Sequence, residues 1–140
     1  MTAQMILHAT TVTFDERAIV LLGASGSGKS ALALQLLALG AILVADDQTV
    51  LTLQDGKVVA SCPPGLEGLV EARGVGLLNT PHRQSATVTL VVDLDQIETA
   101  RLPDHRHITI LGVPLSLVLG LKAAHFPSAL KHYALYGRRA

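Results

Sequence analysis

The sequence has little cysteine and no pattern of residues that would form a structural metal site. Cys62 is its single cysteine, so no disulfide can form within the chain. No group of Cys and His residues has the spacing of a structural zinc site. One unpaired cysteine is typical of a reducing compartment, and we therefore expect a cytoplasmic protein.

Excess charge and aromatic side chains are also missing. The 11 Lys and Arg residues balance the 11 Asp and Glu residues, so the chain has no positive field to attract nucleic acid or an anionic membrane. Aromatic residues make up 3% of the sequence, too few to provide the stacking platforms of single-strand binders. We expect no nucleic-acid partner and no membrane association.

Targeting signals and long apolar runs are absent as well. The first residues, MTAQMILHATTV, lack the basic region and cleavage site of a signal peptide. Every apolar run is well short of the roughly 18 residues that span a bilayer. Hydrophobic residues nevertheless make up 49% of the 140 residues, and charged residues only 16%. This composition predicts one compact domain with a substantial buried core, either α/β or mostly buried sheet.

One glycine-rich stretch fits the phosphate-binding pattern G-x-x-x-x-G-K-[ST] at every fixed position. In such a loop the backbone N–H groups face phosphate oxygens, and the following helix directs its positive end toward them. The lysine reaches the β- and γ-phosphates, and the final hydroxyl binds Mg²⁺. The alternative is an ordinary turn between buried elements. The stretch consists of Gly23, Ala24, Ser25, Gly26, Ser27, Gly28, Lys29 and Ser30.

The residues around this loop match what a phosphate site requires. A strand-like run over residues 17–22 precedes it, and a strong helix former over residues 31–39 follows. Residues 41–45 then predict a short, buried parallel strand. A right-handed crossover would place both strands in one sheet, whose ligands bind beyond the carboxyl ends of its strands. The loop and the residues after position 45 should therefore share one rim.

Asp46 and Asp47 directly follow the second strand. A carboxylate at such a strand end holds Mg²⁺ in many nucleotide-binding proteins. Two carboxylates are one more than the metal needs, and the other could act as a general base toward a hydroxyl. The alternative is that the pair only caps a turn.

The remaining pattern is rich in strands and ends in a helix. We interpret Asp93 and Asp95 as a solvated strand end, with a role in binding Mg²⁺ as the alternative. Glu71 and Arg73 are either site residues or an edge-strand ion pair, and because they are two residues apart they would share one face of a strand. His8 lies within the first expected strand, where a lone histidine usually has a structural role. The further strands are expected over residues 5–14, 48–53, 57–60, 86–94 and 106–113, with an apolar run over 115–119 and a helix over 126–136.

Taken together, His8, GASGSGKS, LVADDQTVL and VEARGVGLL follow one another as in the catalytic domain of bacterial HPr kinase/phosphorylase. The chain resembles most closely the short form that consists of the C-terminal catalytic domain only. The resemblance covers residues 5–94 well and the remainder weakly. It implies a single P-loop kinase catalytic domain over residues 1–140, with a mixed β-sheet, flanking helices and a core like that of phosphoenolpyruvate carboxykinase.

The resemblance also implies an activity. It points to a kinase that uses ATP and Mg²⁺ to phosphorylate a serine of an HPr-type phosphocarrier of the phosphotransferase system, with a reverse phosphorylase activity, and to a homo-oligomer, a hexamer. By this resemblance Asp46 is the general base, with His8 beside it. Asp47 and Glu71 belong to the metal site together with the loop serine. Arg73 handles phosphate or contacts another subunit.

Three positions depart from the family pattern. Ala24 stands where the loop usually has an aspartate, and Ala9 where a glycine is common. Residues 113–121 lack the arginine of a P-V-x-x-G-R segment that is linked to dephosphorylation, so we expect inefficient dephosphorylation.

Two other functions remain open from the residues alone. The first is a small-molecule P-loop kinase, which would need an arginine-rich lid; the sequence has no basic cluster except Arg138 and Arg139. The second is a non-catalytic ATP-binding regulatory module, for which one carboxylate beside the loop would suffice.

Overall fold

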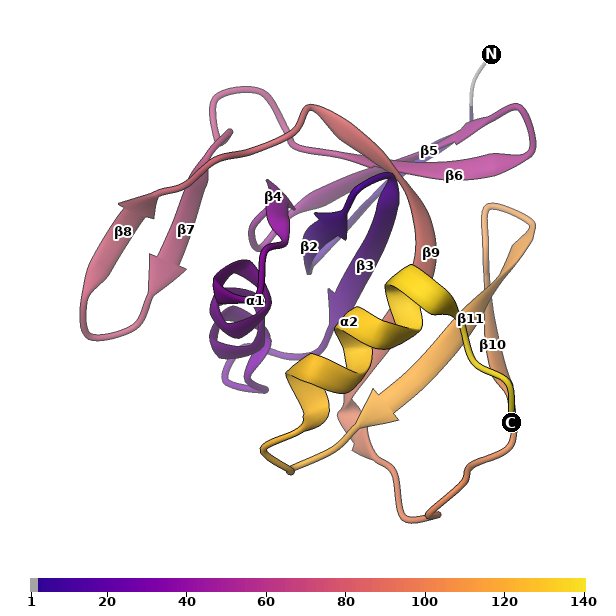
Figure 1. Ribbon diagram of the computed structural model, residues 1–140. Coiled ribbons are helices and arrows are strands. Elements are labelled where there is room, and N and C mark those ends of the chain that lie inside the picture. Colours follow the sequence, from indigo (N-terminus) through magenta and orange to yellow (C-terminus); the bar gives the residue numbers. More distant parts are fainter. Residues whose placement is uncertain (1–2) are drawn as a thin grey trace.

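The computed structural model describes residues 3–140, which form a branched, curled sheet, a separate two-stranded ribbon and two helices (Figure 1). The ribbon consists of β7 (Leu69–Ala72) and β8 (Gly76–Asn79), and the helices are α1 (Lys29–Ala38) and α2 (Phe126–Tyr136). The strands of the main sheet are β1 (Gln4–Leu7), β2 (Ala9–Phe14), β3 (Arg17–Leu22), β4 (Ile42–Ala45), β5 (Thr49–Gln54), β6 (Lys57–Ser61), β9 (Ser85–Ile97), β10 (Arg106–Ile110) and β11 (Val113–Gly120).

Strand β9 holds the main sheet together. It runs parallel to β3 on one side, and on the other side it pairs antiparallel with β6 at its start and parallel with β11 further along. The sheet order is β1-β5-β6-β9-β3-β2-β4, and β11 carries β10 as its outer partner. Because β9 is covered on both faces, its middle is a nearly continuous apolar run, as is usual for a central strand.

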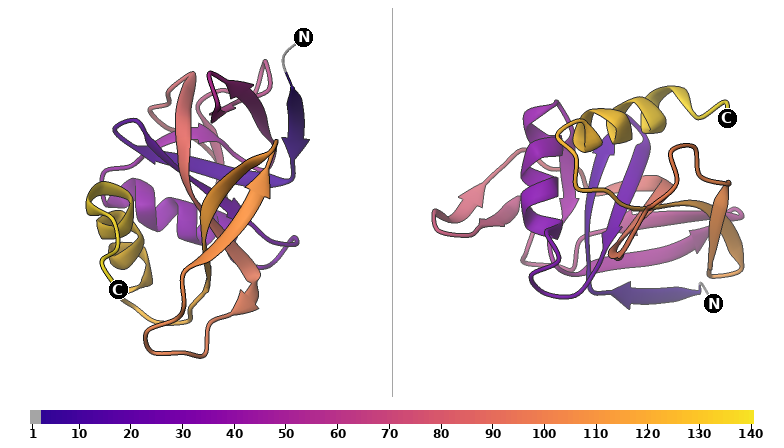
Figure 2. Two further views of the ribbon diagram at one scale, coloured as in Figure 1. Left: turned by 90° about the vertical axis from the view of Figure 1, so that its right-hand side faces the viewer. Right: turned by 90° about the horizontal axis from the view of Figure 1, so that it is seen from below.

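The helices cover one face of the sheet, and curled strands cover the other. Leu36 of α1 and Leu130 of α2 pack against Leu21 and Leu90 in the first core. The second core lies on the opposite face, among β5, β6, β10 and β11. Figure 2 shows α1 and α2 together on one side of the sheet. The mixed α/β fold expected from the resemblance is confirmed.

Strand β2 occupies a central position that the sequence did not indicate. It lies between β3 and β4 and runs antiparallel to both. The strands before and after α1 therefore belong to one sheet and run in the same direction, as expected, but they are not neighbours. The buried strand expected over residues 41–45 is present, but its expected parallel pairing with the strand before α1 is wrong, because β4 pairs antiparallel with β2. The parallel contact of β4 is a single bridge between Leu43 and His82. Burial of an apolar run does not by itself tell parallel from antiparallel pairing.

Two other boundaries differ from expectation. The strand expected over residues 5–14 is broken at His8, since β1 pairs with β5 whereas β2 pairs with β3 and β4. Strand β9 continues to Ile97, so Asp93 and Asp95 lie within it. The turn at Asp55-Gly56 joins β5 to β6 as expected. Over residues 3–140, neither helix is long and apolar enough to cross a membrane.

Candidate active site

The phosphate loop connects β3 to α1 and depends on glycine at both of its ends. Gly23 has a φ of 151°, and a Cβ added there would lie 2.3 Å from Ser27 Oγ. Gly28 has a φ of 102° and is the N-cap of α1. Residues other than glycine rarely adopt such φ angles, because their Cβ atom would clash with the backbone. The two glycines thus explain how the chain turns from the strand into the helix.

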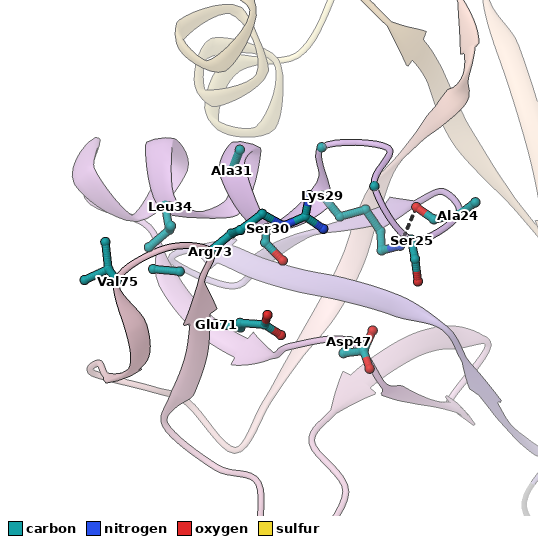
Figure 3. A pocket seen from close by; sticks show the side chains of 13 residues that line it. Ala24, Ser25, Lys29, Ser30, Ala31, Leu34, Asp47, Glu71, Arg73 and Val75 are labelled. Carbon is teal, nitrogen blue, oxygen red and sulfur yellow. Dashed lines mark hydrogen bonds between the residues drawn. The ribbon is translucent and has the colours of Figure 1, made fainter.

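Lys29 is held close to the loop. Its side chain is only 6% exposed, and Nζ donates hydrogen bonds to the carbonyl oxygens of Gly23 and, at 3.3 Å, Ala24. Figure 3 shows the bond to Ala24 as a dashed line. The ammonium group therefore lies at the mouth of the loop, where phosphate oxygens would bind.

Asp95 also contacts the loop, which the sequence did not reveal. The N–H of Ala24 donates to its two carboxylate oxygens at 3.0 and 3.2 Å. The contact follows from register, because Asp93 of β9 pairs with Leu22 of β3, and Asp95 lies two residues further along. Without knowing that these strands are parallel neighbours, no sequence signal places Asp95 beside the loop.

The two aspartates after β4 have different surroundings. Asp46 is half-buried, and its two carboxylate oxygens accept hydrogen bonds from the hydroxyl of Thr10 at 3.0 Å and from the N–H of Glu71 at 2.9 Å. The side chain of Asp47 is 67% exposed, and its Oδ1 lies 3.2 Å from Nδ1 of His8. The carboxylate that is open to a ligand is thus that of Asp47, and the histidine contacts Asp47 and not Asp46.

A cleft of about 380 Å³ brings most of the expected site residues together (Figure 3). The loop and the first turn of α1 form one wall, including Lys29 and Ser30. The opposite wall includes Asp47, which follows β4, and Glu71 and Arg73 from β7 and the turn after it. Gly23, Ser27, Asp46 and His8 do not line the cleft, although each is within one residue or one hydrogen bond of a residue that does.

Glu71 and Arg73 reach this cleft from the ribbon. Glu71 lies in β7, which ends at Ala72, and Arg73 follows in the turn toward β8. Both side chains are exposed and line the cleft, as Figure 3 shows. The shared strand face expected of these two residues is not formed, because Arg73 lies beyond the end of β7; the turn brings Arg73 to the same cleft.

The donor set of the cleft suits a hard cation. Ser30, Asp47 and Glu71 present oxygen atoms only, which is the ligand type that Mg²⁺ prefers. Within the described part of the chain, no three His, Cys, Asp or Glu side chains form a ready-made metal site. Because Mg²⁺ commonly combines one or two carboxylates with water and substrate phosphates, these residues fit Mg²⁺ that arrives with a nucleotide.

Comparison with known proteins gives the family. A family model described as the HPr Serine kinase C-terminal domain matches residues 1–116. The chain belongs to this family. HPr kinase/phosphorylase of Cupriavidus necator is 34% identical over 127 residues, which are 82% of this chain and 39% of that protein. The same enzyme of Burkholderia lata is 36% identical over 124 residues, or 80% of this chain and 38% of that protein.

The chain thus spans about two fifths of the length of these HPr kinase/phosphorylase relatives. A solved structure, the Hpr(Ser) kinase/phosphatase from Coxiella burnetii, matches with a TM-score of 0.78 at 22% sequence identity. The match covers 91% of this chain and 86% of that one, and it supports the fold. Membership of the HPr kinase/phosphorylase family, expected from the order of the motifs, is confirmed.

Proposed function

We propose that this protein is an ATP- and Mg²⁺-dependent kinase that phosphorylates a serine hydroxyl of an HPr-type phosphocarrier. The observation that carries the proposal is the cleft, in which a phosphate loop faces an open carboxylate, Asp47, with Glu71 beside it. A protein that only binds Mg²⁺ and nucleotide needs one carboxylate beside the loop, whereas this cleft has two. A serine kinase needs one to receive the hydroxyl proton.

In the proposed reaction most of the catalysis comes from position and charge. The loop N–H groups and Lys29 would bind the phosphates. Ser30 and Glu71 would hold Mg²⁺, which would neutralise part of the phosphate charge, so that the Asp47 carboxylate stays free to accept a proton. The serine oxygen forms a bond to the γ-phosphorus, the bond from that phosphorus to the β,γ-bridging oxygen breaks, and ADP leaves. The carboxylate of Asp47 takes the serine proton.

We assign the proton acceptor to Asp47, although the resemblance pointed to Asp46. Both oxygens of Asp46 already accept hydrogen bonds from Thr10 and Glu71. Asp47 lines the cleft and contacts His8, which can receive the proton in turn. In this arrangement His8 accepts the proton from Asp47, and Asp46 holds Thr10 and the Glu71 amide by hydrogen bonds.

The reverse reaction uses the same groups. An oxygen of inorganic phosphate forms a bond to the phosphoserine phosphorus, and the bond from that phosphorus to the serine oxygen breaks. Protonated Asp47 donates its proton to the leaving serine oxygen, so the products are serine and pyrophosphate. Since residues 113–121 have no arginine to hold the attacking phosphate, we propose that this direction is slow.

A homo-hexamer in the cytoplasm stays a prediction, and sedimentation of the purified protein tests the oligomeric state.

The decisive experiment incubates the protein with Mg²⁺-ATP and an HPr-type phosphocarrier and locates phosphate by mass spectrometry. We expect phosphoserine with the natural chain and a loss of about 10²-fold or more with Asp47→Asn, as is typical when a general base is removed. Asp55→Asn is the matched control, because Asp55 lies in the exposed turn between β5 and β6. ATP binding should survive in both variants.

The other outcomes are equally informative. Loss of transfer in Asp46→Asn with full activity in Asp47→Asn would return the proton acceptor to Asp46. An unmodified carrier despite tight ATP binding would contradict the kinase proposal for that carrier and favour the regulatory module.

A further inference from the structure

Thr10 of β2 connects the two aspartates of the site. Its hydroxyl donates to Asp46 Oδ1 at 3.0 Å and accepts the N–H of Asp47 at 3.2 Å. One hydroxyl can make both bonds, because it carries one donor and two acceptor positions. Thr10 is only 1% exposed, so water does not compete for its hydroxyl.

The backbone at Asp47 requires such support. Asp47 has a φ of 65°, in the left-handed region that residues with a Cβ rarely adopt. The carbonyl of Asp46 accepts the N–H of Gln48 at 2.7 Å, which closes a three-residue turn around Asp47. Tight turns of this kind with a positive central φ are rare and strained. Strain persists where surrounding contacts over-determine the conformation, and Thr10 bonds the strained residue itself.

The Thr10 hydroxyl is also connected to the β7–β8 ribbon, because Asp46 bonds both Thr10 and Glu71. The second carboxylate oxygen of Asp46 accepts the N–H of Glu71 at 2.9 Å. Among the described residues strand β7 pairs with β8 alone and lies outside the main sheet. Val70 anchors β7 in the first core, and the bond from the Glu71 amide to Asp46 adds a polar contact at the next residue. The Asp46 carboxylate therefore helps to set the position on β7 from which Glu71 enters the cleft, where Figure 3 shows its side chain.

We propose that Thr10 is a positioning residue for phosphoryl transfer. Its hydroxyl holds the Asp47 amide directly and the Glu71 amide through Asp46, so that both carboxylates are aimed into one cleft. Thr10 does not line that cleft, so it would act through the two aspartates. The inference rests on the proposed function for its effect on rate, whereas its hydrogen bonds can be tested without turnover.

The chain offers a matched set of variants. Thr10→Val keeps the shape of the side chain and removes the hydroxyl, and Thr10→Ser keeps the hydroxyl. Thr11→Val is the control, because Thr11 is the next residue of β2, is fully buried, and bonds Thr49 Oγ1 at 2.9 Å instead of the aspartates. Any general cost of losing a buried threonine hydroxyl from β2 appears equally in Thr10→Val and Thr11→Val.

The first measurement is amide hydrogen exchange by NMR. We expect the Asp47 and Glu71 amides to exchange at least about tenfold faster in Thr10→Val than in Thr11→Val, with protection kept in Thr10→Ser. If Thr10→Val does not fold, Asp46→Ala serves instead, because it removes both acceptor oxygens: the Glu71 amide should lose protection, while the Asp47 amide, which bonds Thr10 itself, keeps it. Unchanged exchange at both amides in the folded Thr10→Val protein, or equal changes in Thr11→Val, would overturn the proposal.

The second measurement is the rate of phosphocarrier modification. We expect kcat to fall at least about tenfold in Thr10→Val with KM for ATP within about twofold, since misplaced groups slow the chemical step more than binding by the loop. Thr10→Ser should restore the rate. An undiminished kcat in Thr10→Val would refute the positioning role. If the natural chain transfers no phosphate at all, the proposed function fails, and the exchange data alone then decide whether Thr10 holds the two amides.

Discussion

At the scale of single residues, Lys29 is the group whose loss should cost the most. Its ammonium already lies at the mouth of the loop, held by the Gly23 and Ala24 carbonyls. Lys29→Met keeps most of the buried stem and removes the charge that would meet the β- and γ-phosphates. We expect the single-turnover rate to fall by about 10²–10³, as for other preorganised donors to transition-state charge.

The matched variants are Glu71→Gln and Arg73→Gln, whose side chains line the same cleft. Each should reduce the rate by less than Lys29→Met does. A larger loss in either variant would mean that the metal or the arginine, and not the lysine, provides most of the charge neutralisation.

The site could be predicted from the sequence where it depends on neighbours in the chain. The loop motif fixes Lys29 and Ser30 because their roles follow from a continuous stretch of eight residues. The different surroundings of Asp46 and Asp47 could not be predicted, because they depend on Thr10, which lies 36 residues away from Asp46 in the sequence. The contact of Asp95 with the loop depends in the same way on strand register.

At the scale of elements, replacing a leucine should destabilise the protein strongly in helix α1 and only slightly in the β7–β8 ribbon. Leu77 in β8 is 64% exposed, whereas Leu36 in α1 is fully buried against both helix and sheet. We expect Leu36→Ala to lower the free energy of unfolding by about 2–5 kcal/mol. Leu77→Ser should change it by less than about 0.5 kcal/mol. Urea unfolding of the isolated chain measures both.

A large loss of stability in Leu77→Ser would show that β8 is covered in solution. Repeating the urea titration at several protein concentrations then tests whether a second copy of the chain covers β8. Only association makes the urea midpoint of unfolding depend on protein concentration.

Elements with a strong local signal were predicted well from the sequence. Helix α1 follows from a run of strong helix formers, and the β5–β6 hairpin follows from Asp-Gly between two apolar runs. The break at His8 was missed because residues 5–14 have strand-forming composition throughout. Propensity describes whether a residue suits a strand, and it does not reveal that the two halves pair with different partners.

At the scale of the whole molecule, stability should decrease in acid partly because of Glu98. The N–H of Ala100, and then the Arg106 guanidinium and the N–H of Thr99, hold the pKa of the Glu98 carboxyl below its usual value, against an opposing effect of desolvation. A lowered pKa in the folded state contributes stability above the unfolded pKa, about 4.3, which is lost as pH falls through the folded pKa.

We therefore expect Glu98→Gln to be less stable than the natural chain at pH 7, and the difference to shrink below about pH 4. Thermal unfolding across this pH range provides the measurement. Glu16→Gln is a control, since Glu16 pairs with Arg83 at the surface and should contribute little. A difference between the Glu98 variant and the natural chain that is constant with pH would contradict the expectation.

The place of β9 in the sheet has a consequence for how the protein is made. Every cleft residue named above lies before residue 74, yet β3, which carries the phosphate loop, is bordered by β9, whose residues are 85–97. During synthesis from the N-terminus, the loop, the aspartates and the ribbon all leave the ribosome before the strand that completes their support. A nascent chain that ends before β9 should thus contain the whole set of phosphate-binding residues and still fail to bind nucleotide.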